Sequence, residues 1–181
     1  MTPEFLIALY EQGRFAEFVQ LSEGVGDADV LCMRAFAKAA GWGCIKDVTG
    51  AEVIVNNIFG EIKNRAQNGI AVSQANLAKI FRDGLGVQRD YAVAVRWCRK
   101  AAEQGNARAQ TNLGSVYSNG YGVAKDDLLA VDWYRKAAEQ GYAIAQFCLA
   151  VRHANGRGVE KDDAIAAEWC RKAAEQGYAK A

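Results

Sequence analysis

The side chains best suited to covalent chemistry in this chain are its thiols and its one imidazole. His153 follows Cys148 by five residues and precedes Cys170 by seventeen, which makes these three the candidates for a cysteine nucleophile with a histidine base. No carboxylate stands at a spacing that would orient the imidazole, and no oxyanion-donor motif is visible. His153 also occupies a position that Phe81 and Tyr117 fill at a constant offset, which predicts a core ring that needs a hydrogen-bond partner. We therefore expect no catalytic residue, and a hydrolase that uses these side chains is the enzymatic alternative.

Cofactor and metal sites are not indicated either. The five cysteines are odd in number and contain no CxxC pair, so neither a zinc site nor a disulfide framework is predicted. Gly84 and Gly86 could suggest a phosphate-binding loop, but Arg89 stands where the dinucleotide fingerprint requires its third glycine. These glycines instead predict a hinge. The sequence predicts no cofactor and no metal.

The charge balance restricts the class of partner. Basic and acidic residues number 22 and 21, which removes the strong attraction to nucleic acid or anionic membrane that a basic excess would supply. No segment approaches the roughly 20 apolar residues that span a bilayer, and no signal-peptide pattern opens the chain. We expect a protein or peptide partner, no nucleic acid and no membrane insertion. The thiols favour a reducing, cytoplasmic location, although a periplasmic protein that has lost its leader would have the same sequence.

The elements that position these residues repeat at a fixed offset of 36 residues. In each copy an apolar stripe at i, i+3, i+4, i+7 and i+8 predicts an amphipathic helix. Before each stripe stands an aspartate suited to cap the helix, and after it a glycine suited to end it. The aspartates are Asp90, Asp126 and Asp162, and the glycines are Gly105, Gly141 and Gly177. Such an array buries the apolar face of each unit against its neighbours.

A second helix is predicted in the first half of each copy. Gln110, Leu113, Gly114 and Tyr117 share one face, and alanine replaces Gly114 in the other two copies. The small residue predicts close approach by a neighbouring helix. Short connections force the two helices of a copy to lie antiparallel.

Tryptophans and basic pairs also follow the period. Trp97, Trp133 and Trp169 lie one turn from packing alanines, which favours a core role over stacking on bases or sugars. An Arg-Lys pair follows each tryptophan, and a glutamate comes four residues after each arginine, at Glu103, Glu139 and Glu175. Pairing along the helix therefore predicts a solvated face rather than a basic binding ladder.

Upstream of the repeats the period weakens. Residues 5–21 predict a helix, a turn at Gly13 and a second helix, and residues 30–40 and 52–67 predict two more. We predict a divergent helical cap over residues 1–69 and three repeats over 70–105, 106–141 and 142–177. A truncated start of a fourth repeat follows up to residue 181. The last helical face then lacks a cap, so self-association through it is one expectation.

Residues 71–181 follow the pattern A-x-x-L-G/A-x-x-aromatic-x-x-G-x-G-V-x-x-D-x-x-x-A-x-x-W-x-R-K-A-A-E-Q-G. This pattern resembles the Sel-one-like repeat family, which is related to the tetratricopeptide repeats, and residues 8–19 resemble a tetratricopeptide helix pair. The resemblance implies an all-α fold, a right-handed α/α superhelical solenoid of antiparallel helix pairs. It also implies a non-enzymatic scaffold or adaptor whose concave groove binds a protein or peptide. An immunity protein that neutralises a toxin is an alternative within the same fold.

A binding surface is expected where the copies differ. Matching the concave positions of tetratricopeptide repeats predicts partner-binding residues on the first helix of each copy: Lys79, Arg82, Arg108, Thr111, Ser115, Ile144, Phe147 and Val151. The basic side chains, Lys79, Arg82 and Arg108, belong to the first two copies and the apolar ones to the third, which predicts a groove for an acidic group at one end and an apolar anchor at the other. The alternative is that Ile144 and Phe147 pack against a further helix or a second copy of the chain.

Overall fold

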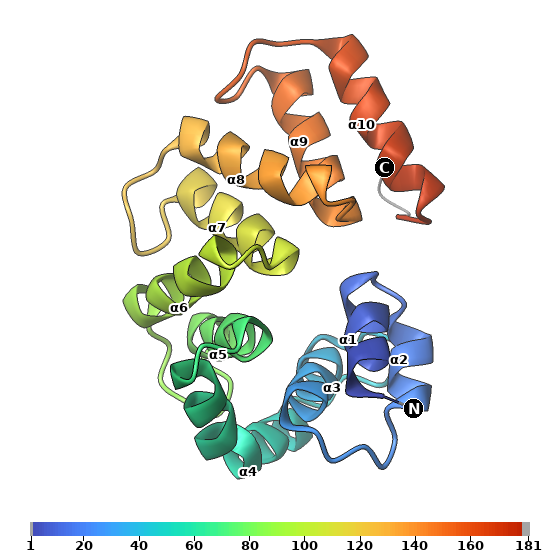
Figure 1. The fold of residues 1–181 in the computed structure, drawn as a ribbon, viewed down its shortest axis with the longest axis vertical. Coiled ribbons are helices and arrows are strands. Elements are labelled where there is room, and N and C mark those ends of the chain that lie inside the picture. The colour runs from blue at the N-terminus through green and yellow to red at the C-terminus, as the bar shows by residue number, and fades with distance from the viewer. Residues whose placement is uncertain (1, 179–181) are drawn as a thin grey trace. The chain divides into compact units, whose positions relative to one another are not determined.

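The computed structural model describes residues 2–178, which form ten α-helices and no strand. Figure 1 shows them in chain order. The helices are α1 (Pro3–Glu11), α2 (Phe15–Leu21), α3 (Ala28–Ala40), α4 (Val48–Gln67), α5 (Ala71–Asp83), α6 (Tyr91–Glu103), α7 (Ala107–Asn119), α8 (Asp127–Glu139), α9 (Ala143–Asn155) and α10 (Asp163–Glu175). The predicted all-α class of packed helix pairs is confirmed.

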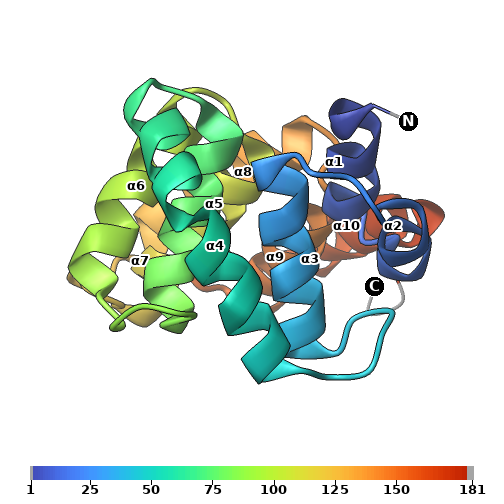
Figure 2. The ribbon, with the colours of Figure 1, turned by 90° about the horizontal axis from the view of Figure 1, so that it is seen from below.

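The chain forms two compact units, unit 1 over residues 1–94 and unit 2 over residues 95–181. In unit 1, α3, α4 and α5 lie side by side (Figure 2), and α1 packs against α2 and α3. In unit 2, α7 packs on α8, α8 on α9 and α9 on α10. The predicted division of the chain into a cap over residues 1–69 and three repeats after it is based on the sequence period, and it stays a prediction. Apart from Tyr178, the predicted start of a fourth repeat lies outside the described residues.

The described residues contain neither a helix that could span a membrane nor a cluster that could hold a metal ion. None of their helices combines the length and the hydropathy that a membrane span requires. No three or more histidine, cysteine or acidic side chains of residues 2–178 come together in a way that could hold a metal ion.

Capping side chains start the helices where the sequence predicts. The Asp126 carboxylate accepts from the Leu129 amide at 2.9 Å, Asp162 accepts from Ala164 and Ile165 at 2.9 Å, and Asp90 accepts from Val93 at 2.9 Å. In α4 the structure differs from the predicted start at residue 52. Asp47 caps this helix by accepting from the Gly50 amide at 2.8 Å, so α4 begins at Val48.

The hinge glycines have the left-handed backbone that glycine alone adopts readily. Gly156 ends α9 with φ of 62°, and Gly158 has φ of 73°. At Gly158 a Cβ atom would overlap the backbone carbonyl of Asp127, because the loop lies directly against the start of α8. The hinge prediction is therefore confirmed on packing grounds for this copy.

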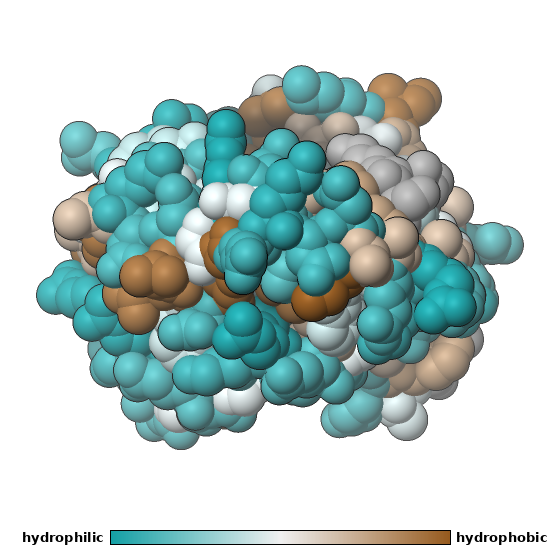
Figure 3. Space-filling model, turned by 90° about the horizontal axis from the view of Figure 1, so that it is seen from above, coloured by the Kyte–Doolittle hydropathy of each residue, from teal (hydrophilic) through white to brown (hydrophobic). Residues whose placement is uncertain are grey.

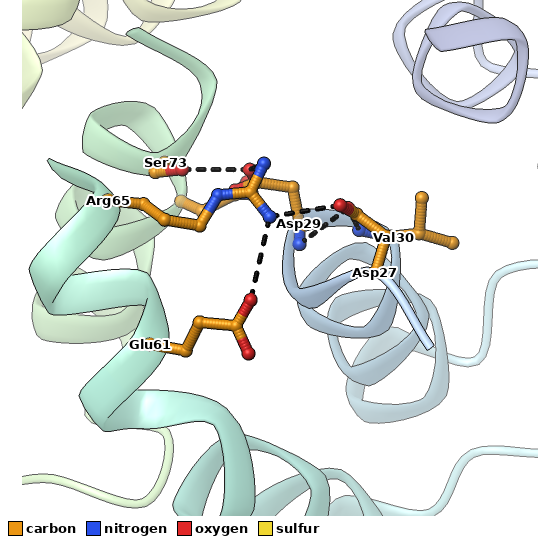
Figure 4. Close-up of polar contacts among 7 residues, drawn as sticks. Asp27, Asp29, Val30, Glu61, Arg65 and Ser73 are labelled. Carbon is orange, nitrogen blue, oxygen red and sulfur yellow. Dashed lines mark hydrogen bonds and ion pairs between the residues drawn. The ribbon is translucent and has the colours of Figure 1, made fainter. Parts of the chain in front are cut away.

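A buried polar network joins three helices of unit 1 (Figure 4). Asp29, at the start of α3, is 1% exposed and accepts from Ser73 and Asn76 of α5 at 2.8 Å each. Arg65 of α4 pairs with Asp29 at 2.9 Å and with Asp27 at 2.9 Å. Because both oxygens of the Asp29 carboxylate are satisfied, its burial is tolerated and its geometry ties α3 to α4 and α5.

The Asp27 carboxylate belongs to the same network. Partial burial alone would raise its pKa, but the hydrogen bond from Arg65 and those from the amides of Val30 and Asp29 outweigh that effect. The net result is a pKa below the ordinary value for aspartate. The charged form of Asp27 therefore stabilises the folded state.

Buried glutamines repeat along the array. Gln110 donates to the Ala102 carbonyl at 3.1 Å, and Gln146 donates to the Ala138 carbonyl at 3.3 Å. Their own side-chain oxygens accept from Gln140 at 2.7 Å and from Gln176 at 2.8 Å. These glutamines lie on a core face because the preceding helix supplies an acceptor carbonyl and the residue that ends the following helix supplies a donor, as a buried amide needs.

Candidate functional site

A hollow of about 240 Å³ opens among α3, α4 and α5 of unit 1. Its lining is mostly apolar, with one ion pair: Phe36, Ala39, Ala40, Val48, Lys79, Asp83 and Leu85. Pockets for drug-sized ligands have about 300–1,000 Å³, and a cavity of about 150 Å³ holds benzene. The hollow therefore matches one aliphatic or aromatic side chain better than a cofactor.

Lys79 brings positive charge to this hollow. Its Nζ lies 2.6 Å from Asp83 Oδ2 and 4.7 Å from the centre of the Phe36 ring, and the Trp42 ring is 5.8 Å away. Arg82 pairs with the same carboxylate, Nε to Oδ1 at 2.8 Å. The structure thus brings together two of the predicted binding residues, Lys79 and Arg82, on one carboxylate.

The electrostatics of Asp83 follow from these two cations. Burial acts to raise the pKa of Asp83, but the hydrogen bond from Arg82 and the charges of Lys79 and Arg82 lower it below its usual value. Lys79 and Arg82 thus place two cations beside the hollow. An anionic group of a ligand would be favoured there.

Apolar side chains are also exposed in the loop between α3 and α4 and at the start of α4, where Val48 lines the hollow. Ile45 is 91% exposed, Val48 43% and Trp42 40%. The Trp42 ring stacks on Phe15 at 4.7 Å, which holds it in place. This surface could not be predicted from the period, because residues 41–48 do not belong to the repeat.

The predicted residues of α7 are less accessible than expected for a groove. Arg108 is 6% and Thr111 7% exposed, and Ser115 is half-buried. The Thr111 hydroxyl donates to the Ala107 carbonyl at 2.8 Å, and Ser115 accepts from Asn119. Their role in binding a partner stays a prediction.

The predicted apolar residues of α9 lie together in unit 2. Ile144 and Phe147 are half-buried, and Val151 is 40% exposed. The Phe147 ring lies 5.5 Å from the ring of Tyr178, so part of this face is covered by the chain itself. The choice between a partner and a second copy on the remainder stays open to experiment.

Arg152 is a site residue that the sequence analysis missed. Its guanidinium pairs with Asp127 of α8 at 2.8 Å, donates to the Ser118 hydroxyl of α7, and lies 5.7 Å from the Tyr134 ring. The signal was present, because Val116 holds the same position in the preceding repeat and is 7% exposed. An arginine at an apolar core position predicts a buried polar partner.

The tryptophans lie at the edge of the core. All three are half-buried, and Trp169 packs against the core cluster of α8 and α9. The lysine three residues later lies over each ring, with Nζ to ring-centre distances of 4.8 Å at Trp97, 4.2 Å at Trp133 and 4.3 Å at Trp169. Each half-buried indole therefore binds a cation on its ring, and that of Trp169 also packs on the core.

The sequence predicted that each Arg-Lys pair forms ion pairs with the glutamate four residues after its arginine. For the described residues this prediction is wrong. Arg135 pairs with Asp132 at 3.3 Å, and Lys172 pairs with Glu168 at 2.7 Å. These acids precede the basic residues because Arg and Lys point back toward the helix N-terminus, as helical side chains do.

The candidate catalytic side chains are poorly suited to nucleophilic chemistry. Burial raises the pKa of Cys148 to about 11, and the charge of Arg152 offsets this only in part. His153 is half-buried, and within the described chain its Nδ1 has no hydrogen-bond partner, contrary to the prediction. Among the described residues no hydrogen bond at Nδ1 therefore fixes the tautomer that a general base would need.

Comparison with known proteins identifies the repeats. The Sel1 repeat family model matches residues 71–106, 107–142 and 143–178. A Sel1 repeat protein from Oxalobacter formigenes is 36% identical with a TM-score of 0.62, over 65% of this chain and 90% of that one. A protective antigen of uropathogenic Escherichia coli with an SLR fold is 34% identical with a TM-score of 0.65, over 90% of this chain but only 33% of that one. A Sel1 repeat protein from Klebsiella pneumoniae shares the fold at 19% identity and a TM-score of 0.52, over 91% of this chain and 79% of that one. No curated protein matches.

Proposed function

The chain belongs to the Sel1 repeat family, and we propose that it is a non-enzymatic scaffold or adaptor that binds a protein or peptide partner. Sel1 repeat proteins are generally scaffolds for protein–protein interaction, and their fold is typically non-catalytic. The face drawn in Figure 3 is largely hydrophilic, with hydrophobic side chains gathered in small patches. A scaffold of this kind binds through local sites rather than through one extended apolar face.

The observation that carries the proposal is the hollow beside α5. It joins an apolar lining to a lysine and an arginine that share one carboxylate. The partner places an apolar side chain between Phe36 and Val48 and a neighbouring carboxylate near Lys79 and Arg82. This arrangement is supported by the volume of the hollow, by the exposed Val48 in its lining and by the Trp42 ring near Lys79.

Capture of partners from the native cell with matched variants tests this site. Lys79→Val removes the cation and introduces the side chain that the third repeat has at Val151. Ala40→Trp fills the hollow from an exposed position at the end of α3. Lys63→Val, on the exposed face of α4, is the control for loss of one surface charge. We expect both site variants to lose a partner that the wild type and the control retain.

Equal recovery of every partner by all four proteins, with helical content unchanged, would refute the site. Loss of the partner in the Lys63 control as well would show that charge alone governs capture. Either result would leave family membership intact, but it would remove the α5 hollow from the proposal.

The hydrolase alternative has its own test at Cys148. Because burial raises the pKa of this thiol to about 11, little thiolate exists at neutral pH, and alkylation by iodoacetamide should be slow. We expect the modification of Cys148, followed by peptide mass spectrometry, to rise only in alkaline solution. Rapid alkylation of Cys148 in the folded protein at neutral pH would contradict this and revive the enzymatic alternative.

A further inference from the structure

Unit 2 has a second hollow, of about 480 Å³, between α6 and the loop that joins α7 to α8. Arg96, Arg99, Lys100 and Glu103 of α6 line one side, and Gly122 and Val123 of the loop line the other. The surface lies on the second helix of its repeat, whereas the predicted groove residues lie on the first. It is therefore separate from the sites considered above.

The charges on this hollow are not balanced. Three cations face one carboxylate, and within residues 2–178 none of the three forms an ion pair. Arg99 donates to the hydroxyl of Tyr117 at 2.8 Å, and Lys100 lies over the Trp97 ring. Both contacts hold the cations in place without neutralising them.

The sister repeats show what is different here. The position of Arg96 holds Asp132 in the second repeat and Glu168 in the third. Asp132 pairs with Arg135 at 3.3 Å, and Glu168 pairs with Lys172 at 2.7 Å. The first repeat therefore replaces the neutralising acid by a third base, and like charges this close on a helix destabilise it.

We infer that this hollow binds an acidic segment of a protein partner. The carboxylates of that segment take the place that Asp132 and Glu168 occupy in the sister repeats. Val95 and Val123 form an apolar floor for an aliphatic side chain between two acids. The inference rests on the proposed function only in that the ligand is a protein segment, and it does not require the α5 hollow.

An acidic peptide fits this surface better than a nucleic acid. A nucleic-acid backbone extends over several repeats and needs a continuous basic stripe. Along the same helical face, the next repeats present Asp132 and Glu168, and the whole chain carries a net charge of only +1. The basic surface is confined to one repeat, as for a short acidic segment.

Direct binding of synthetic probes tests the inference. The probe is a fluorescein-labelled peptide of alternating glutamate and leucine, compared with the same peptide carrying glutamine in place of glutamate and with a labelled single-stranded oligonucleotide. Fluorescence anisotropy measures Kd, and amide shifts of Gly122 and Val123 in NMR spectra report where the peptide binds. We expect the acidic peptide to bind and to shift both amides, and the glutamine peptide to bind weakly.

Two variants and a control complete the experiment. Arg96→Asp and Arg96→Glu introduce the acids of the sister repeats, so both should fold, and each should weaken peptide binding by about tenfold. Arg157→Asp makes the same charge change on an exposed loop and should leave Kd close to that of the wild type. Lys79→Val should also bind normally, which separates this hollow from the α5 site.

Three results would overturn the inference. The first is the absence of binding by the acidic peptide, or of shifts at Gly122 and Val123. The second is equal weakening by Arg96→Asp and Arg157→Asp, which would indicate attraction by net charge alone. The third is tighter binding of the oligonucleotide than of the peptide, which would assign the surface to nucleic acid.

Discussion

Substitution of Gly114 by alanine tests how unit 2 is packed. Gly114 is buried in α7, and a Cβ atom there would lie 2.8 Å from Cδ1 and Cε1 of Tyr134 and 3.0 Å from the carbonyl oxygen of Ala130. Real Cβ atoms do not approach other atoms this closely, so the ring or the helix must move. Because Gly114 has no side chain, the large ring of Tyr134 in α8 can pack against α7.

Two opposing terms set the magnitude. Alanine in place of glycine favours a helix by about 1 kcal/mol. Insertion of a methyl group into a packed core costs about 1–3 kcal/mol. We therefore expect Gly114→Ala to lower the free energy of unfolding by about 1 kcal/mol, which corresponds to a fall of about 2–4 °C in Tm for a chain of this size.

The sister repeats supply the compensating change. In the third repeat, the positions of Gly114 and Tyr134 hold Ala150 and Cys170, a larger residue opposite a smaller one. Tyr134→Cys should remove the clash, so that Gly114→Ala stabilises the protein in that background. The resulting double-mutant cycle should give a coupling energy of about 1 kcal/mol or more.

Urea unfolding followed by tryptophan fluorescence is the measurement, since Trp97, Trp133 and Trp169 all lie in unit 2. Ala150→Gly is the matched control and should lower stability by about 1 kcal/mol through helix propensity. Wild-type stability in Gly114→Ala, or a cycle that is additive within about 0.5 kcal/mol, would refute the packing argument.

Three further predictions concern polar groups. Arg65→Met removes the ion-pair partner of the buried Asp29 and should lower the free energy of unfolding by about 3 kcal/mol, measured by urea unfolding with far-UV circular dichroism. The buried Nδ1 of His153 has no hydrogen-bond partner within residues 2–178, so His153→Phe, which introduces the residue type of Phe81, should raise Tm, with a gain of about 1 kcal/mol in the free energy of unfolding. Because the pKa of Asp27 is lower in the folded chain, its stabilisation is present above the unfolded pKa of about 3.9 and is lost as pH falls through the folded value. Asp27→Asn should therefore lose less stability than the wild type on acidification below about pH 4, as urea unfolding at several pH values would show.

Much of the fold could be read from local patterns. The capping aspartates at Asp126 and Asp162 and the glycine stops at Gly105 and Gly141 are local signals, because each acts on a backbone within three residues of itself. The structure has them where the period places them. The start of α4 was missed because the weak period near Asp47 hid a capping residue.

The candidate sites were harder to predict. Lys79 and Arg82 were selected because the copies differ there, but Trp42 and Ile45 lie outside the repeat and had no sister residue for comparison. Arg99 and Lys100 were assigned to a solvated face, because pairing was expected along the helix toward Glu103, and Arg96 was not singled out. Whether a charge is neutralised depends on the rotamers and neighbours that surround it, and spacing alone does not determine these.

By itself the sequence determined the array: the apolar stripes of the repeats, the capping and stop residues of their helices, and the family to which the repeats belong. These are properties of short segments and of a period that repeats them. The tertiary structure decided which cations remain without a carboxylate, which hollow lies beside Lys79, and why Gly114 stands opposite Tyr134. Such features depend on side chains from different helices meeting at distances of a few ångströms, and only the packed chain brings them there.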